Sequence, residues 1–156
     1  MLAISIIQPW PFGIVFLDKR LENRSWPVPR HVIGQRVAIH VSKTWNPDEV
    51  AVDWDDCHEA CADDGLWRAV ELRFGKLRLR DLDAMRGRVI GSVLVMGDVT
   101  QSDSPWFCGE HGHVYDRVLA LPSMVGPVRG ALGYWQLPDD IADQVLHQEA
   151  LARGVA

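Results

Sequence analysis

The chain has few cysteines and no long apolar run, and these scarcities exclude two broad classes of protein. Its three cysteines are an odd number without the spacing of a disulfide framework, which fits a reducing compartment. The longest apolar runs, such as Val89–Met96, are much shorter than a membrane span. The start, Met1–Ile4, has neither a basic segment nor a cleavage site for secretion. We therefore expect a cytoplasmic protein with no membrane partner.

Several well-known functional motifs are also missing. The sequence has no Walker-type phosphate loop, no dinucleotide-binding glycine fingerprint and no Gly-x-Ser-x-Gly elbow. With 156 residues, the chain is long enough for one domain of ordinary size and too short for two. Its composition, 47% hydrophobic and 24% charged, is that of an ordinary globular domain. We predict a single domain over residues 1–156.

Charge is distributed unevenly along the sequence. The formal net charge is −5, which by itself argues against a nucleic-acid partner. Residues 1–45, however, hold six basic against two acidic residues, and residues 76–88 hold five against two. Between them, residues 46–75 hold nine acidic against two basic residues, and we call this stretch the acidic insert. Basic residues grouped in this way can form one positive face that binds a polyanion. Alternatively, they scatter over the surface when the chain folds.

Hydrophobic periodicity predicts alternating strands and helices. Residues 36–41 alternate apolar and polar side chains, and residues 89–100 form the strongest apolar β-type run. Asn46 and Asp63–Gly65 are cap and break signals for helices in the acidic insert. The predicted strands are 2–7, 21–26, 36–41, 89–100, 114–121 and 131–137, and the predicted helices are 11–17, 46–62, a second one in the acidic insert and a terminal one at 138–152. This pattern predicts an α+β fold, a small and mostly antiparallel β-barrel with peripheral helices.

Four segments carry a family resemblance. They are Ser5–Trp10, Lys19–Trp26, Ile39–Trp45 and Arg129–Trp135, and the loop Ser104–Gly109 followed by Gly112 adds a fifth match. In this order they resemble the ASCH domain family of the PUA-like superfamily. The resemblance implies a PUA-like barrel that binds RNA in a cleft. Some similar proteins remove an acyl group from a modified cytidine, and others have been proposed to cut RNA.

Lys19, Glu22 and Arg24 match the functional motif of that family. In its amidohydrolase branch the motif is Lys-x-x-Thr-x-Arg, with the Lys and Thr catalytic, and Glu22 stands here at the Thr position. On a strand, Glu22 and Arg24 point to one face, and Lys19 enters from the preceding turn. Such a group can clamp a phosphate, hold a base amino group or transfer a proton. The alternative is a surface network of ion pairs.

Tryptophan and histidine supply the other candidate site residues. Seven tryptophans are many for this length, and aromatic rings beside cations suit single-stranded RNA. Four of them, Trp10, Trp26, Trp45 and Trp106, fall in loops and are expected at the ligand, whereas Trp54, Trp67 and Trp135 are expected to pack in the fold. His40 is a candidate general acid or base, with Lys43 on a phosphate, although a lone strand histidine often only hydrogen-bonds.

Metal ligands are present without the spacing of a zinc module. Cys57, His58 and Cys61 can equally form one buried helix face, and Cys108 precedes His111 and His113. We expect no metal and no cofactor. The sequence predicts a protein that binds RNA or a modified nucleoside. The alternative is a metal-independent hydrolase, a ribonuclease or a nucleoside amidohydrolase, that uses Lys19 and Glu22.

Overall fold

The computed structural model describes residues 1–155, which form one six-stranded sheet and its covering helices. The strands are β1 (Leu2–Ile6), β2 (Leu21–Arg24), β3 (Arg36–Val41), β4 (Val89–Val99), β5 (His111–Val125) and β6 (Tyr134–Gln136). The helices are α1 (Trp10–Phe16), the short 3-10 helix Arg30–Val32, α2 (Pro47–Ala60), α3 (Asp64–Phe74), α4 (Leu79–Asp83) and α5 (Asp139–Ala152). The α+β class predicted from the sequence is confirmed.

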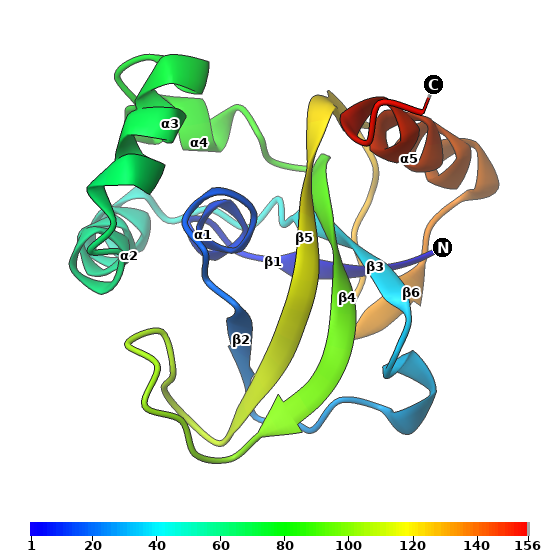
Figure 1. The fold of residues 1–156 in the computed structure, drawn as a ribbon, viewed down its shortest axis with the longest axis horizontal. Helices are drawn as coiled ribbons and strands as arrows, with labels where there is room; N and C mark the ends of the chain where they lie inside the picture. The colour runs from blue at the N-terminus through cyan, green and yellow to red at the C-terminus, as the bar shows by residue number, and fades with distance from the viewer. Residues whose placement is uncertain (156) are drawn as a thin grey trace.

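The sheet is curled and open (Figure 1). Its strand order is β2-β5-β4-β3-β1-β6, so β2 and β6 form its two edges. Only β1 and β3 run parallel, while the other four pairs are antiparallel, as the sequence predicts for most of the sheet. The small β-barrel that we predicted has the form of an open half-barrel. It curls because the long pairing of β4 with β5 contains several register shifts, which bend and twist strands.

Strand bounds follow the predictions closely in β1, β3 and β4 and differ in β2, β5 and β6. β2 ends at Arg24, two residues earlier than predicted. β5 is longer than predicted at both ends, because its first residues also pair with β2 and Val125 pairs with Val89 of β4. β6 has three residues where seven were predicted, because it pairs only with Leu2, Ala3 and Ile4 of β1. Residues 129–133 lie outside the ladder and form a loop that reaches the candidate site described below.

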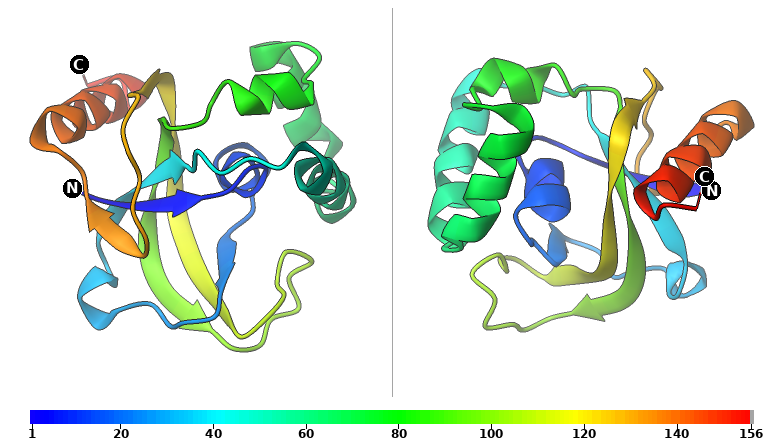
Figure 2. Two further views of the ribbon diagram at one scale, coloured as in Figure 1. Left: turned by 180° about the vertical axis from the view of Figure 1, so that it is seen from behind. Right: turned by 45° about the horizontal axis from the view of Figure 1, so that its top comes forward.

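The acidic insert is helical, as predicted. The Asn46 side chain accepts a hydrogen bond from the backbone N–H of Asp48 at the start of α2, and Pro47 occupies the first turn. Asp63 caps α3 by accepting from the backbone N–H groups of Gly65 and Leu66. These caps divide the insert into α2 and α3, which lie on one side of the molecule, with α5 on the other side (Figure 2).

Two apolar clusters hold these layers on the sheet. The larger includes Phe12 and Ile14 of α1 and joins them to the strands and to α2 and α3. The smaller includes Leu121 of β5 and Val145 of α5. α1 approaches β4 closely at Gly91, where a Cβ atom would lie 2.6 Å from Val15 Cγ2. This contact fixes α1, and with it the segment that carries Trp10 and Lys19, against the sheet.

Within residues 1–155, every helix is too short or too polar to cross a lipid bilayer.

Candidate functional site

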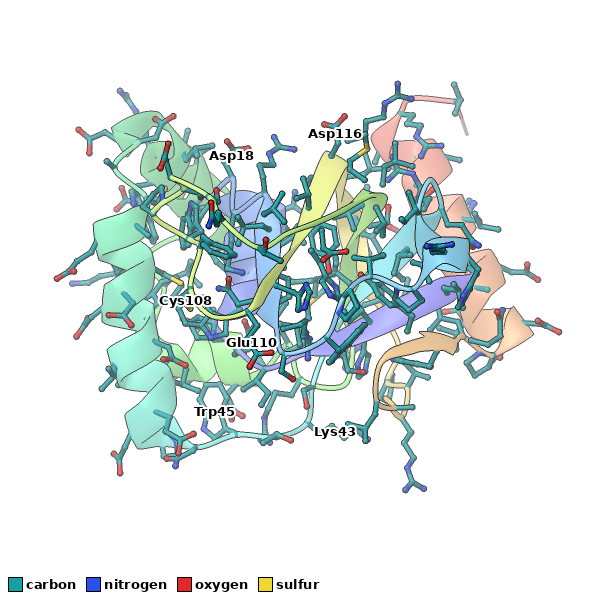
Figure 3. All side chains as sticks on the ribbon, turned by 90° about the horizontal axis from the view of Figure 1, so that it is seen from below. Asp18, Lys43, Trp45, Cys108, Glu110 and Asp116 are labelled. Atoms are coloured by element: carbon teal, nitrogen blue, oxygen red, sulfur yellow. The ribbon has the colours of Figure 1, made fainter. Side chains whose placement is uncertain are left out.

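A cleft of about 630 Å³ opens beside the ends of β1 and β3. Its walls come from four parts of the chain: β1 with the start of α1, β2, the segment from β3 into α2, and the loop before β6. The lining residues are Ser5, Ile6, Ile7, Trp10, Glu22, Arg24, His40, Ser42, Lys43, Thr44, Glu49, Asp53 and residues 129–133. Figure 3 labels Lys43 on the connection from β3 to α2. The cleft volume is typical of small-molecule sites.

Lys19 lies behind the wall of this cleft. Its side chain is only 1% exposed, and a Cβ atom at Gly13 on α1 would lie 3.4 Å from Lys19 Cδ. The ammonium Nζ donates to the backbone oxygen of Leu21 at 2.5 Å and to Glu22 Oε2 at 2.8 Å. It also lies 5.5 Å from the ring centre of Trp10. Lys19 is thus a buried cation with several partners.

Glu22 connects Lys19 to Arg24. Its Oε1 lies 3.4 Å from Arg24 Nη2, while its Oε2 accepts from Lys19. Arg24 Nη2 also donates to the backbone oxygen of Ser5 at 3.1 Å, which ties β2 to β1. The buried Nε–H of Arg24 has no hydrogen-bond partner among residues 1–155. The structure therefore brings the predicted three residues together, with Glu22 and Arg24 in the cleft and Lys19 beneath it.

His40 belongs to a hydrogen-bonded chain. Trp135 Nε1–H donates to Ser5 Oγ at 3.0 Å, and Ser5 Oγ lies 3.0 Å from His40 Nδ1. His40 Nε2 lies 3.2 Å from the backbone oxygen of Val128, so Nε2 carries the proton and Nδ1 accepts from Ser5. Burial lowers the pKa of His40, and the charge of Lys43 lowers it further. His40 is therefore a neutral histidine that fixes three segments.

Gly130 lies directly against this chain. A Cβ atom at position 130 would be 2.5 Å from Ser5 Oγ and 2.7 Å from His40 Cε1. Only a residue without a side chain allows the loop before β6 to come so close. The close approach places Arg129 and Leu132 at the rim of the cleft. Gly130 is thus the reason that this distant loop forms one wall of the site.

The lining of the cleft carries charges of both signs. Among its basic residues, Lys43 and Arg129 are exposed, on the connection from β3 to α2 and on the loop before β6. Among its acidic residues, Glu49 and Asp53 come from α2. Burial raises the pKa of Asp53, and the carboxylates of Asp56 and Glu49 raise it further. The cleft can therefore accept a ligand with an anionic end and a hydrogen-bond-donating end.

Of the four loop tryptophans predicted at the ligand, one lines the cleft. Trp10 does, at the start of α1. Trp26 packs edge-on against His113 and Tyr134, and Trp45 lies under the guanidinium of Arg86. Trp106 packs against the larger apolar cluster, and its backbone oxygen accepts from Asn23. None of these three rings lines the cleft, although Trp26 also lies 6.0 Å from the guanidinium carbon of Arg24, which does.

The remaining tryptophans pack in the fold, as expected. Trp54 and Trp67 contact each other edge-on between α2 and α3, and Trp135 lies edge-on to His40. His58 stacks on Trp67 with ring centres 4.0 Å apart. Burial raises the pKa of Cys57 to about 12, so its thiol stays protonated at neutral pH. Among residues 1–155, no three His, Cys, Asp or Glu side chains converge as a metal site.

Sequence reasoning left out several residues of the cleft. Ser5, Arg129 and Gly130 lie in segments that carry the family resemblance, but nothing in their spacing shows that they meet. Glu49 and Asp53 belong to the acidic insert, where a solvated helix face is the ordinary interpretation. One pattern could have grouped them: Glu49 and Asp53 are four positions apart, and residues four apart lie on the same face of a helix.

We predict that Lys19→Met lowers the free energy of unfolding by about 3–5 kcal/mol, because it leaves the buried Glu22 carboxylate without its nearest cation. Lys19→Met/Glu22→Gln should recover at least about 1 kcal/mol of that loss. Urea unfolding measures both. The control, Lys76→Met at an exposed position, should change stability by less than about 0.5 kcal/mol. If Lys19→Met is as stable as the control Lys76→Met, this account is contradicted.

The buried histidine predicts a pH dependence of stability. In the unfolded chain His40 binds a proton near about pH 6.5, whereas in the fold it binds one only at lower pH. Its contribution to stability is therefore complete above about pH 6.5 and is lost progressively as the pH falls below that value toward the lower pKa of the folded state. Urea unfolding at about pH 7.5 and 5.5 should show a smaller difference for His40→Gln than for the wild type.

Part of the dependence should remain in that variant, because burial also lowers the pKa of His113. His147→Gln, at an exposed position on α5, is the matched control and should keep the wild-type difference. If the free energy of unfolding changes equally between the two pH values in the wild type and in His40→Gln, His40 binds protons equally in the folded and the unfolded state.

Comparisons with known proteins assign the chain to no family. No protein-family model matches the chain, and no curated protein is significantly similar to it in sequence.

Proposed function

We propose that the protein binds one nucleotide of single-stranded RNA, or a modified nucleoside, in the cleft between β1, β2, α2 and the loop before β6. The resemblance of the motifs to the ASCH family of PUA-like domains and the half-barrel sheet support this proposal. The observation that carries it is that basic and acidic side chains line the same cleft, with Lys43 and Arg129 from two connecting segments and Glu49 and Asp53 from α2.

The charge pattern fits the two ends of a nucleotide. Arg24, Lys43 and Arg129 offer guanidinium and ammonium donors to a phosphate, and arginine binds phosphate with two parallel hydrogen bonds. Glu49 and Asp53 offer acceptors to the amino group of a base. A purely cationic groove would fit a long polyanion better than this cleft does. One nucleotide therefore suits the site better than a duplex.

Trp10 supplies an aromatic surface between these two ends. Lys19 lies 5.5 Å from the centre of its ring, and the ring also packs on the larger apolar cluster. An aromatic ring held in this way can stack on a base, which adds about 1–3 kcal/mol without reading its sequence. We assign Trp10 to the base, and Lys43 and Arg129 to the phosphate.

A metal-independent hydrolase, either a ribonuclease or an amidohydrolase acting on an acylated cytidine, is the second candidate. The continuous ion pairs of Lys19, Glu22 and Arg24 favour it, because coupled groups can exchange a proton. Against it, Lys19 is buried and absent from the lining of the cleft. A ligand can therefore bind to this geometry as it stands, whereas catalysis by Lys19 would require Lys19 to become accessible from the cleft.

Fluorescence anisotropy with a labelled single-stranded RNA tests the proposal. Affinity should fall with salt, and Lys43→Ala and Arg129→Ala should each reduce the slope of log affinity against log salt by about 0.7. Arg80→Ala, on the exposed surface of α4 outside the cleft, should leave the slope unchanged. Equal slopes in all four proteins, or no binding of RNA or modified nucleosides, would refute the proposal.

Incubation with RNA and with an acylated cytidine, in the presence of a chelator, separates the two candidates. A binding protein leaves both compounds intact. Turnover that Lys19→Arg abolishes, with ligand affinity kept within about tenfold, would establish the hydrolase instead.

A further inference from the structure

A second cavity of about 780 Å³ lies on another part of the molecule, between α3, the α4–β4 connection, β5 and α5. It shares no lining residue with the cleft. In Figure 1 this is the upper end of β5, which stands between α3 and α4 on the left and α5 on the right. Its volume is within the range of small-molecule sites, roughly 300–1,000 Å³.

The floor of this cavity is apolar and reaches the core. Met85 and Ile90 belong to the larger apolar cluster and Leu121 to the smaller one, and each is at most 4% exposed. Phe16 and Phe74 form an aromatic side wall. Met124 at the rim is 43% exposed, and a methionine there can adapt to different shapes. A ligand that reaches this floor must have an apolar body.

Two arginines line this cavity, and Ser123 is its other polar side chain. Arg73 lies over the rings of Phe16 and Phe74, with its guanidinium carbon 5.2 and 5.3 Å from their centres. Its Nη2 donates to the backbone oxygen of Leu121 at 2.7 Å. Arg88 Nη1 donates to the backbone oxygen of Gly126 at 3.2 Å. These contacts fix both side chains and use a minority of their five N–H donors each.

Neither arginine has a carboxylate partner within residues 1–155. Both are absent from the ion pairs of the structure, and no acidic residue lines the cavity. Arg73 has no such partner although it belongs to the acidic insert. Fixed guanidinium groups with spare donors, above an apolar floor, are suited to an anionic group.

We infer that this cavity binds an amphiphilic anion, with its apolar chain on the floor formed by Met85, Ile90 and Leu121 and its anionic head between Arg73 and Arg88. The head is a carboxylate or a phosphate monoester, since both accept hydrogen bonds from guanidinium groups. The inference is independent of the function proposed for the cleft.

Backbone amide NMR spectra of the full chain, titrated with decanoate, decyl phosphate or decylammonium, test this inference. The two anions should bind at low millimolar concentration or below and shift the amides of Leu121, Ser123 and Phe74. The tighter anion identifies the head group. Decylammonium, with the same chain and the opposite charge, should not bind. No binding of either anion, equal binding of decylammonium, or shifts confined to the cleft would overturn the inference.

Two kinds of variant locate the ligand. Arg73→Met and Arg88→Met should each weaken anion binding about tenfold, because each removes charge-assisted hydrogen bonds. Arg80→Met, on the surface outside the cavity, is the matched control and should bind like the wild type. Should the arginine variants fail to fold, Ala152→Trp, at the exposed end of α5, narrows the mouth without touching the arginines and should abolish binding. Unchanged affinity in Ala152→Trp would refute the site.

Discussion

The sharing of the Glu22 carboxylate between Lys19 and Arg24 is the interaction on which the candidate site depends. Lys19 is buried, so its charge requires a counter-ion, and the Glu22 carboxylate lies 2.8 Å away. The other oxygen of Glu22 holds Arg24 at the cleft, where Arg24 also ties β2 to Ser5 of β1. The buried Lys19 thus supports the half-buried Arg24. Replacing Lys19 changes the site without touching its lining.

Close backbone approach is the second constraint on the site. Gly130 allows the loop before β6 to lie against Ser5 and His40, and Gly91 allows α1 to lie against β4. The first approach brings Arg129 to the cleft, and the second places Trp10 there. Two glycines therefore allow segments that are far apart in the sequence to line one cleft. The second cavity differs, since its arginines are held by backbone oxygens of β5 and of the turn that follows it.

Local patterns predicted the parts of this structure that depend on neighbouring residues. Strand alternation placed Glu22 and Arg24 on one face, and cap residues divided the acidic insert at Asp63. Contacts between distant segments could not be predicted in this way. Trp106 was predicted at the ligand like Trp10, yet only Trp10 lines the cleft, and Asn23 of β2 holds the backbone of Trp106. Likewise, the register of β6 on β1 leaves residues 129–133 free to reach the cleft, and no periodicity in the sequence specifies that register.

Chemical-shift mapping with cytidine monophosphate tests the central claim most directly. The account predicts that the indole N–H of Trp10 and the backbone amides of Thr44 and residues 130–133 shift together and saturate at one concentration. Residues of the second cavity, such as Ser123, should not shift in the same titration. Shifts that leave Trp10 and residues 130–133 unchanged, or that gather on the loop between β4 and β5 where Figure 3 labels Cys108 and Glu110, would contradict it.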